Sequence, residues 1–243
     1  MIGVNELAGK YAVVTGGSGG IGGAIVRSLQ KAGAVATSLD LSPPPDSDIH
    51  WLHCDVRSDD SVGSAVQQFF KQGGRLDLVI HAAGISREAV VWKLAVEDWD
   101  MTQAVNLRGA FLLLRHTIPL MRRGQGGRVV LIGSINGSRG KFGTSAYSAS
   151  KAGLLGLAKS VARETGRFGI LVNVIEPGWV RTPLTEALPA AARQAAEAES
   201  LLGSLLEVSD VATAVLFLCG PGASRITGQI LRVDAGQFLG GGA

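Results

Sequence analysis

The chain has 243 residues, of which 46% are hydrophobic and 18% are charged, and its formal net charge is +3. A chain of this length can form one α/β domain around one core, and no apolar run reaches the roughly 18 to 20 residues that a membrane-spanning helix needs. Its Lys and Arg residues are scattered, without a long basic run or interleaved aromatic residues, which argues against a nucleic-acid-binding protein. Because the start of the chain does not resemble a secretory signal, we expect a cytoplasmic protein that does not act at a membrane.

Short β-branched runs alternate with longer amphipathic segments along the chain, which is typical of βαβ units. The pattern predicts strands at 11–15, 34–39, 49–54, 76–81, 128–132, 171–175 and 230–233. It predicts helices at 21–31, 60–72, 97–121, 148–167 and 209–218. Several strands are apolar throughout, as in a sheet covered on both faces. We therefore predict an α/β fold, with residues 1–243 forming a single-domain Rossmann fold: a doubly wound seven-stranded parallel sheet with helices on both faces.

Residues 182–206 interrupt this alternation after a Pro-Gly turn. The segment is rich in Ala, Glu and Leu and is helical by propensity. An insertion at this place could form a lid over the ends of the strands.

A glycine-rich turn, TGGSGGIGGAIV at 15–26, follows the first predicted strand and opens the first helix. Glycines let the backbone approach a pyrophosphate, which the helix N-terminus attracts with its free N–H groups. A plain tight loop is the alternative for this motif alone. Asp40 ends the second strand, where a carboxylate can accept hydrogen bonds from a ribose diol and would repel a 2′-phosphate. This favours NAD as the cofactor, although Asp40 as a solvated loop acid, and use of NADP, stay open.

Tyr147 and Lys151 stand one helical turn apart within SAYSASK, among small residues. A nearby ammonium group favours the phenolate, so we expect Lys151 to lower the pKa of Tyr147. The phenol could then act as general base in oxidation and general acid in reduction.

Further motifs extend along the chain: CDV at 54–56, HAAG at 81–84, VNLRGAF at 105–111, IGSINGS at 132–138, EPGWVRT at 176–182 and ITGQILRVDAG at 226–236. With the glycine turn and YSASK, they make the chain resemble short-chain dehydrogenases/reductases from about residue 7 to 236. Within that family it looks most similar to 3-oxoacyl-(acyl carrier) reductases and their alcohol-dehydrogenase relatives.

The resemblance implies a role for each matching position. The catalytic set would be Asn106, Ser134, Tyr147 and Lys151. Cofactor-binding residues would be Gly16, Ser18, Gly19, Gly20, Ile21, Gly22, Asp40, Leu41, Asp55, Val56, Ala82, Ala83, Gly84, Tyr147, Lys151, Pro177, Gly178, Val180 and Thr182. Substrate-binding residues would be Ser134, Asn136, Tyr147 and Trp179. Asn106 could hold a water that links Lys151 to solvent, or it could be a structural amide that kinks its helix.

Two departures from the family pattern stand out. Ala82 replaces an Asn whose side chain usually ties neighbouring strands, so local rigidity is in question. Phe168 stands where carrier-dependent reductases generally have an arginine, which weakens carrier recognition, although Arg122, Arg123 and Arg167 are nearby in sequence. His81, which directly precedes Ala82, is expected to be a core imidazole or, alternatively, a cofactor contact.

We therefore expect an NAD-dependent oxidoreductase that interconverts a secondary alcohol and a ketone. Its substrate would be a small molecule, cyclic or resembling an acyl thioester. The alternative is an NADPH-dependent 3-oxoacyl-carrier or CoA reductase, and a non-catalytic dinucleotide-sensing protein is a third reading. The sequence shows no Cys/His cluster at metal spacing, so we expect no metal. The family further implies a homotetramer, formed through the two long helices and the last strand.

Overall fold

The computed structural model describes residues 6–124, 126–182, 185 and 190–240. Their strands form one parallel seven-stranded sheet in the order β3-β2-β1-β4-β5-β6-β7. The strands are β1 (Tyr11–Thr15), β2 (Val35–Asp40), β3 (His50–His53), β4 (Leu78–His81), β5 (Gly127–Ile132), β6 (Ile170–Pro177) and β7 (Ile230–Val233). The chain reverses its direction of travel across the sheet between β3 and β4, so β1 and β4 flank the switch point where dinucleotides bind in such folds. The predicted fold class is confirmed.

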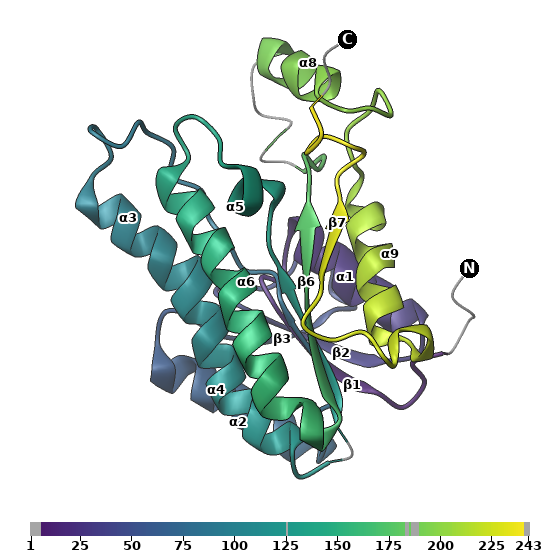
Figure 1. Ribbon diagram of the computed structural model, residues 1–243. Helices are drawn as coiled ribbons and strands as arrows, with labels where there is room; N and C mark the ends of the chain where they lie inside the picture. The colour runs from purple at the N-terminus through teal and green to yellow at the C-terminus, as the bar shows by residue number, and fades with distance from the viewer. Residues whose placement is uncertain (1–5, 125, 183–184, 186–189, 241–243) are drawn as a thin grey trace.

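Helices cover both faces of the sheet (Figure 1). One face carries α1 (Gly20–Lys31) and α9 (Val208–Cys219), which pack against each other. The other face carries α2 (Asp59–Gly73), α4 (Gly109–Met121) and α6 (Ser145–Thr165). The remaining helical segments are α3 (Val96–Gln103), α5 (Ile135–Arg139), α8 (Ala190–Ala198), the π-helical turn η1 (Ala104–Arg108) and the 3₁₀ turns η2 (Gly166–Phe168) and η3 (Pro221–Ala223).

Two apolar cores lie between these layers, because side chains alternate in direction along each strand. In β1, Val13 contributes to the core under α2, α4 and α6, whereas Ala12 and Val14 contribute to the core under α1 and α9. All three are fully buried. A sheet packed on both sides is a rigid support for the loops at its carboxyl edge.

The predicted helix 97–121 is confirmed as one helical segment from Val96 to Met121, but it is not α-helical throughout. Residues 104–108 form a π turn between α3 and α4, with Asn106 fully buried in it. Such turns are rare and often mark functional sites, and helical periodicity alone does not reveal one. The predicted helix 148–167 begins earlier, at Ser145, so the whole SAYSASK motif is helical. The other observed ends differ from the predicted ones by at most two residues, which is ordinary for helix and strand termini.

The predicted lid is described only in part, because residues 183–184 and 186–189 lie outside the described residues. Its described helix, α8, confirms the helical propensity, and Figure 1 shows α8 beyond the carboxyl ends of β6 and β7. In the part of the chain that the structure describes, no helix has both the length and the apolar character needed to cross a membrane.

Candidate active site

The glycine-rich turn connects β1 to α1 at the switch point of the sheet. Gly16 has φ +69°, and a Cβ there would lie 2.7 Å from the Cα of Ala83 after β4. A Cβ at Gly22 would lie 2.1 Å from the carbonyl oxygen of Gly16. Neither position can accept a side chain without a shift of the backbone, so these two glycines are required by the turn itself.

Gly19 is different, because a Cβ built there meets no atom within 4 Å in the described structure. It is the N-cap of α1, whose first turn has neither a side-chain cap among the described residues nor an acidic residue. Within the described residues, the start of α1 thus lacks a side-chain cap, and the space beside Gly19, between Ser18 and Gly20, is open. This arrangement fits a dinucleotide pyrophosphate, which explains Gly19 better than the plain-loop alternative does.

Asp40 is held beside this turn at the end of β2. One carboxylate oxygen accepts from the Ser18 backbone N–H at 3.1 Å, and the other accepts from the Leu41 N–H at 2.8 Å. A carboxylate has about four acceptor positions, so capacity for a ribose diol is left. Arg27, on α1, lies 3.9 Å from the Asp46 carboxylate.

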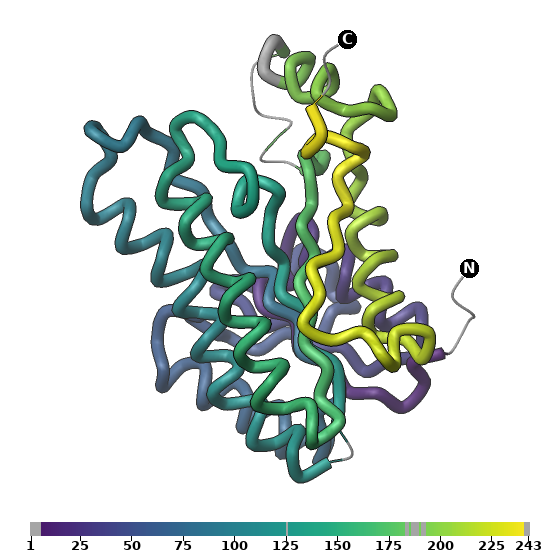
Figure 2. The backbone as a smooth tube through the Cα atoms, viewed as in Figure 1, coloured from purple at the N-terminus to yellow at the C-terminus, as the bar shows by residue number. Residues whose placement is uncertain are grey.

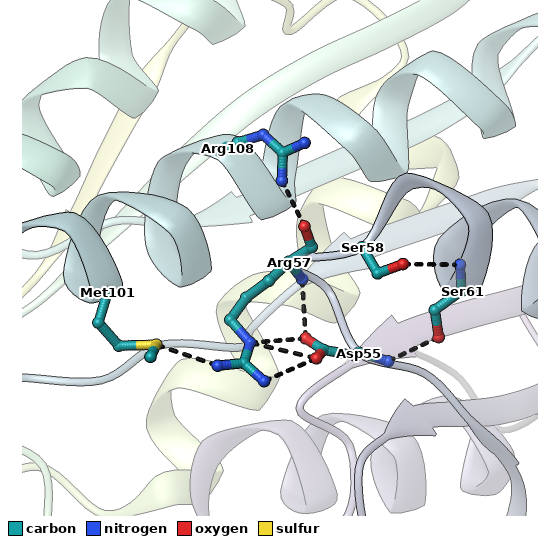
Figure 3. A network of polar contacts seen from close by, with 6 residues as sticks. All are labelled: Asp55, Arg57, Ser58, Ser61, Met101 and Arg108. Atoms are coloured by element: carbon teal, nitrogen blue, oxygen red, sulfur yellow. Dashed lines mark hydrogen bonds and ion pairs between the residues drawn. The ribbon is translucent and has the colours of Figure 1, made fainter. Parts of the chain in front are cut away.

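Asp55, predicted at the adenine end, belongs to a polar network that the sequence did not suggest (Figure 3). The Arg57 guanidinium donates to both of its carboxylate oxygens, at 2.9 Å from Nε and 2.7 Å from Nη2. This hydrogen bonding holds the pKa of Asp55 below its usual range. Arg108, in the π turn, donates to the Arg57 carbonyl oxygen. Val56, next to Asp55, is buried against Gly109.

The catalytic residues implied by the resemblance come together at the carboxyl ends of β4 and β5. Lys151 is 4% exposed, and its ammonium donates to the Ile132 carbonyl oxygen at 2.8 Å. Its Nζ lies 5.7 Å from the centroid of the Tyr147 ring and 3.3 Å from the position that a Cβ of Gly84 would take. Ser134 lies two residues past the end of β5 and caps α5, where its Oγ accepts from the Asn136 N–H at 3.2 Å.

The expected effect of Lys151 on Tyr147 is wrong for this structure, because the pKa of Tyr147 is raised, not lowered. Desolvation of the phenolate is the main cause; a hydrogen bond with Ser134 acts in the opposite direction, and Glu88 adds repulsion. Lys151 is itself desolvated, and burial lowers its pKa to about 8. Here the ammonium is directed to a carbonyl oxygen, so burial outweighs its attraction for the phenolate.

Asn106 uses its side chain to join two segments of the site. Its amide Nδ2 donates to the Ile85 carbonyl and to the Ser150 hydroxyl, both at 2.9 Å. Its Oδ1 accepts from the Ile85 N–H at 2.8 Å. These contacts are those of a structural amide, the alternative considered for Asn106, and its role in holding a water stays a prediction.

His81 provides a link between β1 and the π turn, next to the position where Ala82 replaces the family's Asn. The imidazole is completely buried, with Nδ1 2.9 Å from the Thr15 hydroxyl and Nε2 3.2 Å from the Asn106 carbonyl oxygen. A carbonyl only accepts, so Nε2 carries the hydrogen and the Thr15 hydroxyl donates to Nδ1. Burial, with a smaller contribution from Lys151, lowers the pKa of His81 to about 3. The imidazole is a core histidine, and it gives this region a rigidity that Ala82 does not.

The segment after β6 forms another wall of the site. Gly178 follows Pro177 and donates its N–H to the Val233 carbonyl, and Val180 is buried. The Thr182 methyl group lies 3.9 Å from the position that a Cβ of Gly20 would take, so this segment reaches the glycine-rich turn. Trp179 lies under the Lys141 ammonium, which is 4.2 Å from its ring centroid.

A shallow pocket with a volume of about 300 Å³ lies between residues 89–92 and 140–143, beside the start of α6. Trp92 and Phe142 on its rim are 76% and 85% exposed. Asn136, predicted to contact the substrate, accepts from Arg139 Nε at 3.3 Å. Among the described residues, no group of three or more His, Cys, Asp or Glu side chains could hold a metal ion.

The chain is similar in sequence and in structure to known proteins. Residues 16–237 match the family described as enoyl-(acyl carrier protein) reductase. The chain is 33% identical over 247 aligned positions to the 3-oxoacyl-[acyl-carrier-protein] reductase FabG of Thermotoga maritima, covering 96% of this chain and 100% of that one. It is 33% identical to an acetoacetyl-CoA reductase of an Acinetobacter species, with 95% and 98% covered. Among solved structures, the aldohexose dehydrogenase of Thermoplasma acidophilum is similar, with a TM-score of 0.93, 29% identity and 98% and 97% coverage.

Proposed function

The chain belongs to the short-chain dehydrogenase/reductase family of oxidoreductases, and from this premise we propose that it is an NAD-dependent enzyme interconverting a secondary alcohol and a ketone, with Tyr147 as the acid/base. The observation that carries the proposal is that Tyr147, Ser134 and Lys151 meet at the carboxyl edge of the sheet, past β5. Strand β4 separates β5 from β1, which carries the glycine-rich turn. When bound, the nicotinamide supplies or accepts the hydride.

The raised pKa of Tyr147 favours the reduction direction of the proposed reaction at neutral pH. At neutral pH the phenol holds its proton, which suits a general acid that protonates a carbonyl oxygen during reduction. Ser134, next to the phenol, can donate a hydrogen bond to the same oxygen as negative charge develops on it. Alcohol oxidation needs the phenolate, so we expect it to be favoured by alkaline pH.

Preference for NAD rests on Asp40. Its carboxylate is fixed beside the glycine-rich turn by the Ser18 N–H, and a negative charge there disfavours a 2′-phosphate. The test compares dissociation constants for NADH and NADPH in the wild type, Asp40→Ala and the control Asp48→Ala, whose exposed Asp48 lies in the same loop region. We expect Asp40→Ala to improve NADPH binding about tenfold or more, equivalent to about 1.4 kcal/mol. Tighter binding of NADPH than NADH by the wild type would contradict the preference.

A second candidate is an NADPH-dependent 3-oxoacyl thioester reductase, which the names of two relatives favour. One structural observation also supports it: Arg122 and Arg167 both stack on Phe168, with guanidinium carbons 4.2 and 4.7 Å from the ring centroid. Two cations thus surround the position where the expected arginine is missing, and they could meet an acidic carrier or a CoA phosphate.

An activity panel separates the two candidates and narrows the substrate. It pairs each dinucleotide with cyclic secondary alcohols, 3-hydroxyacyl thioesters and aldohexoses, and follows absorbance of the reduced cofactor. Turnover confined to thioesters with NADPH would establish the second candidate. Binding of a dinucleotide without turnover of any substrate would point to a non-catalytic, dinucleotide-sensing protein.

We also propose that the chain assembles as a homotetramer through α4, α6 and the last strand. Phe111, on α4, is 47% exposed, which is unusual for a large apolar side chain on a helix that otherwise packs into the core. Sedimentation equilibrium would test this assembly.

A further inference from the structure

Gln237 lies in the turn after β7, near the end of the described chain, yet it is only 1% exposed. Its side-chain oxygen accepts from the Trp179 backbone N–H at 2.7 Å. Its side-chain nitrogen donates to the Ala196 carbonyl oxygen in α8 at 2.9 Å. Its own backbone carbonyl accepts from Arg139 Nη1 in α5 at 2.8 Å. One residue thus connects the segment after β6, the helix α8 and the helix that Ser134 begins, and Figure 2 shows the C-terminal segment running beside α8.

The turn that carries Gln237 has an unusual backbone. Ala235 has φ +52° and is the one non-glycine residue with positive φ among the described residues, and Gly236 follows with φ +82°. The Asp234 carboxylate stabilises this shape by accepting from the N–H groups of Gly236 at 3.0 Å and Phe238 at 2.7 Å. Backbone strain of this kind persists only where surrounding contacts determine the conformation. Here it directs the Gln237 side chain inward.

The partner backbone is shaped to receive this side chain. A Cβ at Gly178 would lie 2.2 Å from the Gln237 side-chain oxygen, and 2.9 Å from the Asp234 Cα. The side chain therefore fits at this place only because residue 178 is a glycine. The contact lies directly before Trp179 and Val180, which the family resemblance predicts to bind substrate and cofactor, respectively.

The same turn is fixed to α5 by charged groups. Arg139 donates through Nη2 to Glu199, just past α8, at 2.7 Å, in addition to its bond with the Gln237 carbonyl. The Arg232 guanidinium stacks on the Phe238 ring at 3.4 Å and donates to the buried Glu176. Glu176 accepts from the Ser138 hydroxyl of α5 at 2.5 Å. The turn, α5, the end of β6 and Glu199 just past α8 thus form one connected polar network.

We propose that Gln237 is a positioning residue: it holds the segment of Trp179 and the helix α8 in register with α5 and Ser134, and so sets the shape of the substrate side of the site. This inference rests on the proposed function for its catalytic consequence. Gln237 itself contacts no reacting atom in this arrangement and acts through the Trp179 backbone and α8.

The experiment compares the wild type with Gln237→Ala, Gln237→Glu and the control Gln229→Ala. Gln229 is a second glutamine near β7, and its exposed side chain donates to the Thr227 carbonyl. Gln237→Glu keeps an acceptor for the Trp179 N–H but loses the donor to Ala196, so it separates the two side-chain bonds.

Hydrogen–deuterium exchange of residues 178–182 and 190–206 is the first readout, because it requires no activity. We expect faster exchange there in Gln237→Ala, exchange at least as fast in Gln237→Glu, because its buried carboxylate faces the Ala196 carbonyl oxygen, and unchanged exchange in β1 and α1. The second readout is KM for the best alcohol or ketone found, which we expect to rise about tenfold in Gln237→Ala, while the affinity for ADP changes less than about twofold.

Exchange and KM in Gln237→Ala equal to those in Gln229→Ala would overturn the positioning role. Faster exchange at every element would also overturn it, because the effect would then be general destabilisation. If no substrate is turned over by the wild type, the proposed function fails, while the exchange measurement still decides whether Gln237 holds this segment.

Discussion

His81 gives the most quantitative prediction, through the variant His81→Asn. The imidazole is neutral when folded, since its pKa of about 3 lies far below the ordinary value of 6.5. In the unfolded chain it takes up a proton as the pH falls through 6.5, so the unfolded state binds more protons and stability decreases with decreasing pH. Linkage gives a loss of about 2 kcal/mol between pH 8 and pH 5 from this residue alone, and about 4 kcal/mol by pH 3.

The variant removes this pH dependence along with the hydrogen bonds to Thr15 and the Asn106 carbonyl. At pH 8 we expect it to lower the free energy of unfolding by about 2 to 3 kcal/mol, and at pH 5 by about 2 kcal/mol less. Subtracting the destabilisation at pH 5 from that at pH 8 cancels the contribution of every other titrating group that the variant leaves unchanged.

Urea denaturation of the wild type, His81→Asn and the control His53→Asn, at both pH values, measures it. His53 is exposed at the end of β3 and makes a matched control. A cost for His81→Asn that is equal at pH 8 and pH 5 would refute the assignment of a buried neutral imidazole.

Two further predictions concern the cofactor turn and the active-site cation. Gly22→Ala should destabilise the fold by about 1 to 3 kcal/mol, because the new methyl group meets the Gly16 carbonyl oxygen at 2.1 Å. Gly19→Ala should leave thermal stability nearly unchanged and weaken NADH binding. Equal thermal stability of the two variants would contradict this packing argument. For ketone reduction, kcat/KM should fall as the pH rises through about 8, where Lys151 loses its proton. The pH profile of Lys151→Met should lack this decrease. A decrease at the same pH in the variant would assign it to another group.

The fold was predictable because the chain shows its two periods clearly. Strand β1 alternates between two buried faces, and the apolar positions of α1 and α9 recur with helical spacing. The sequence offered Asn106 as an amide that kinks its helix, but its helical pattern does not specify a π turn at 104–108. The Asn106 side chain in that turn bonds to Ile85 and Ser150, which are distant in sequence.

In the candidate site too, the residues in local motifs were predictable, and the contacts between distant segments were not. Glycines, Asp40, Ser134, Tyr147 and Lys151 lie in local motifs, and the sheet topology brings them to one edge. The roles of His81 and Gln237 depend on contacts between segments more than twenty residues apart, which no local pattern encodes. The pKa of Tyr147 was predicted with the wrong sign, because spacing gives the presence of the lysine but not the desolvation of the half-buried phenol or the direction of the ammonium.

The most direct test of the proposed chemistry is single-turnover hydride transfer in Tyr147→Phe, measured with saturating dinucleotide and the best substrate from the panel. Phenylalanine keeps the ring and removes the hydroxyl, so dinucleotide affinity and thermal stability should stay close to those of the wild type. We expect the rate to fall about 10² to 10⁴-fold at every pH from 6 to 10. A variant that binds the dinucleotide and transfers hydride at the wild-type rate would show that the proton comes from another group.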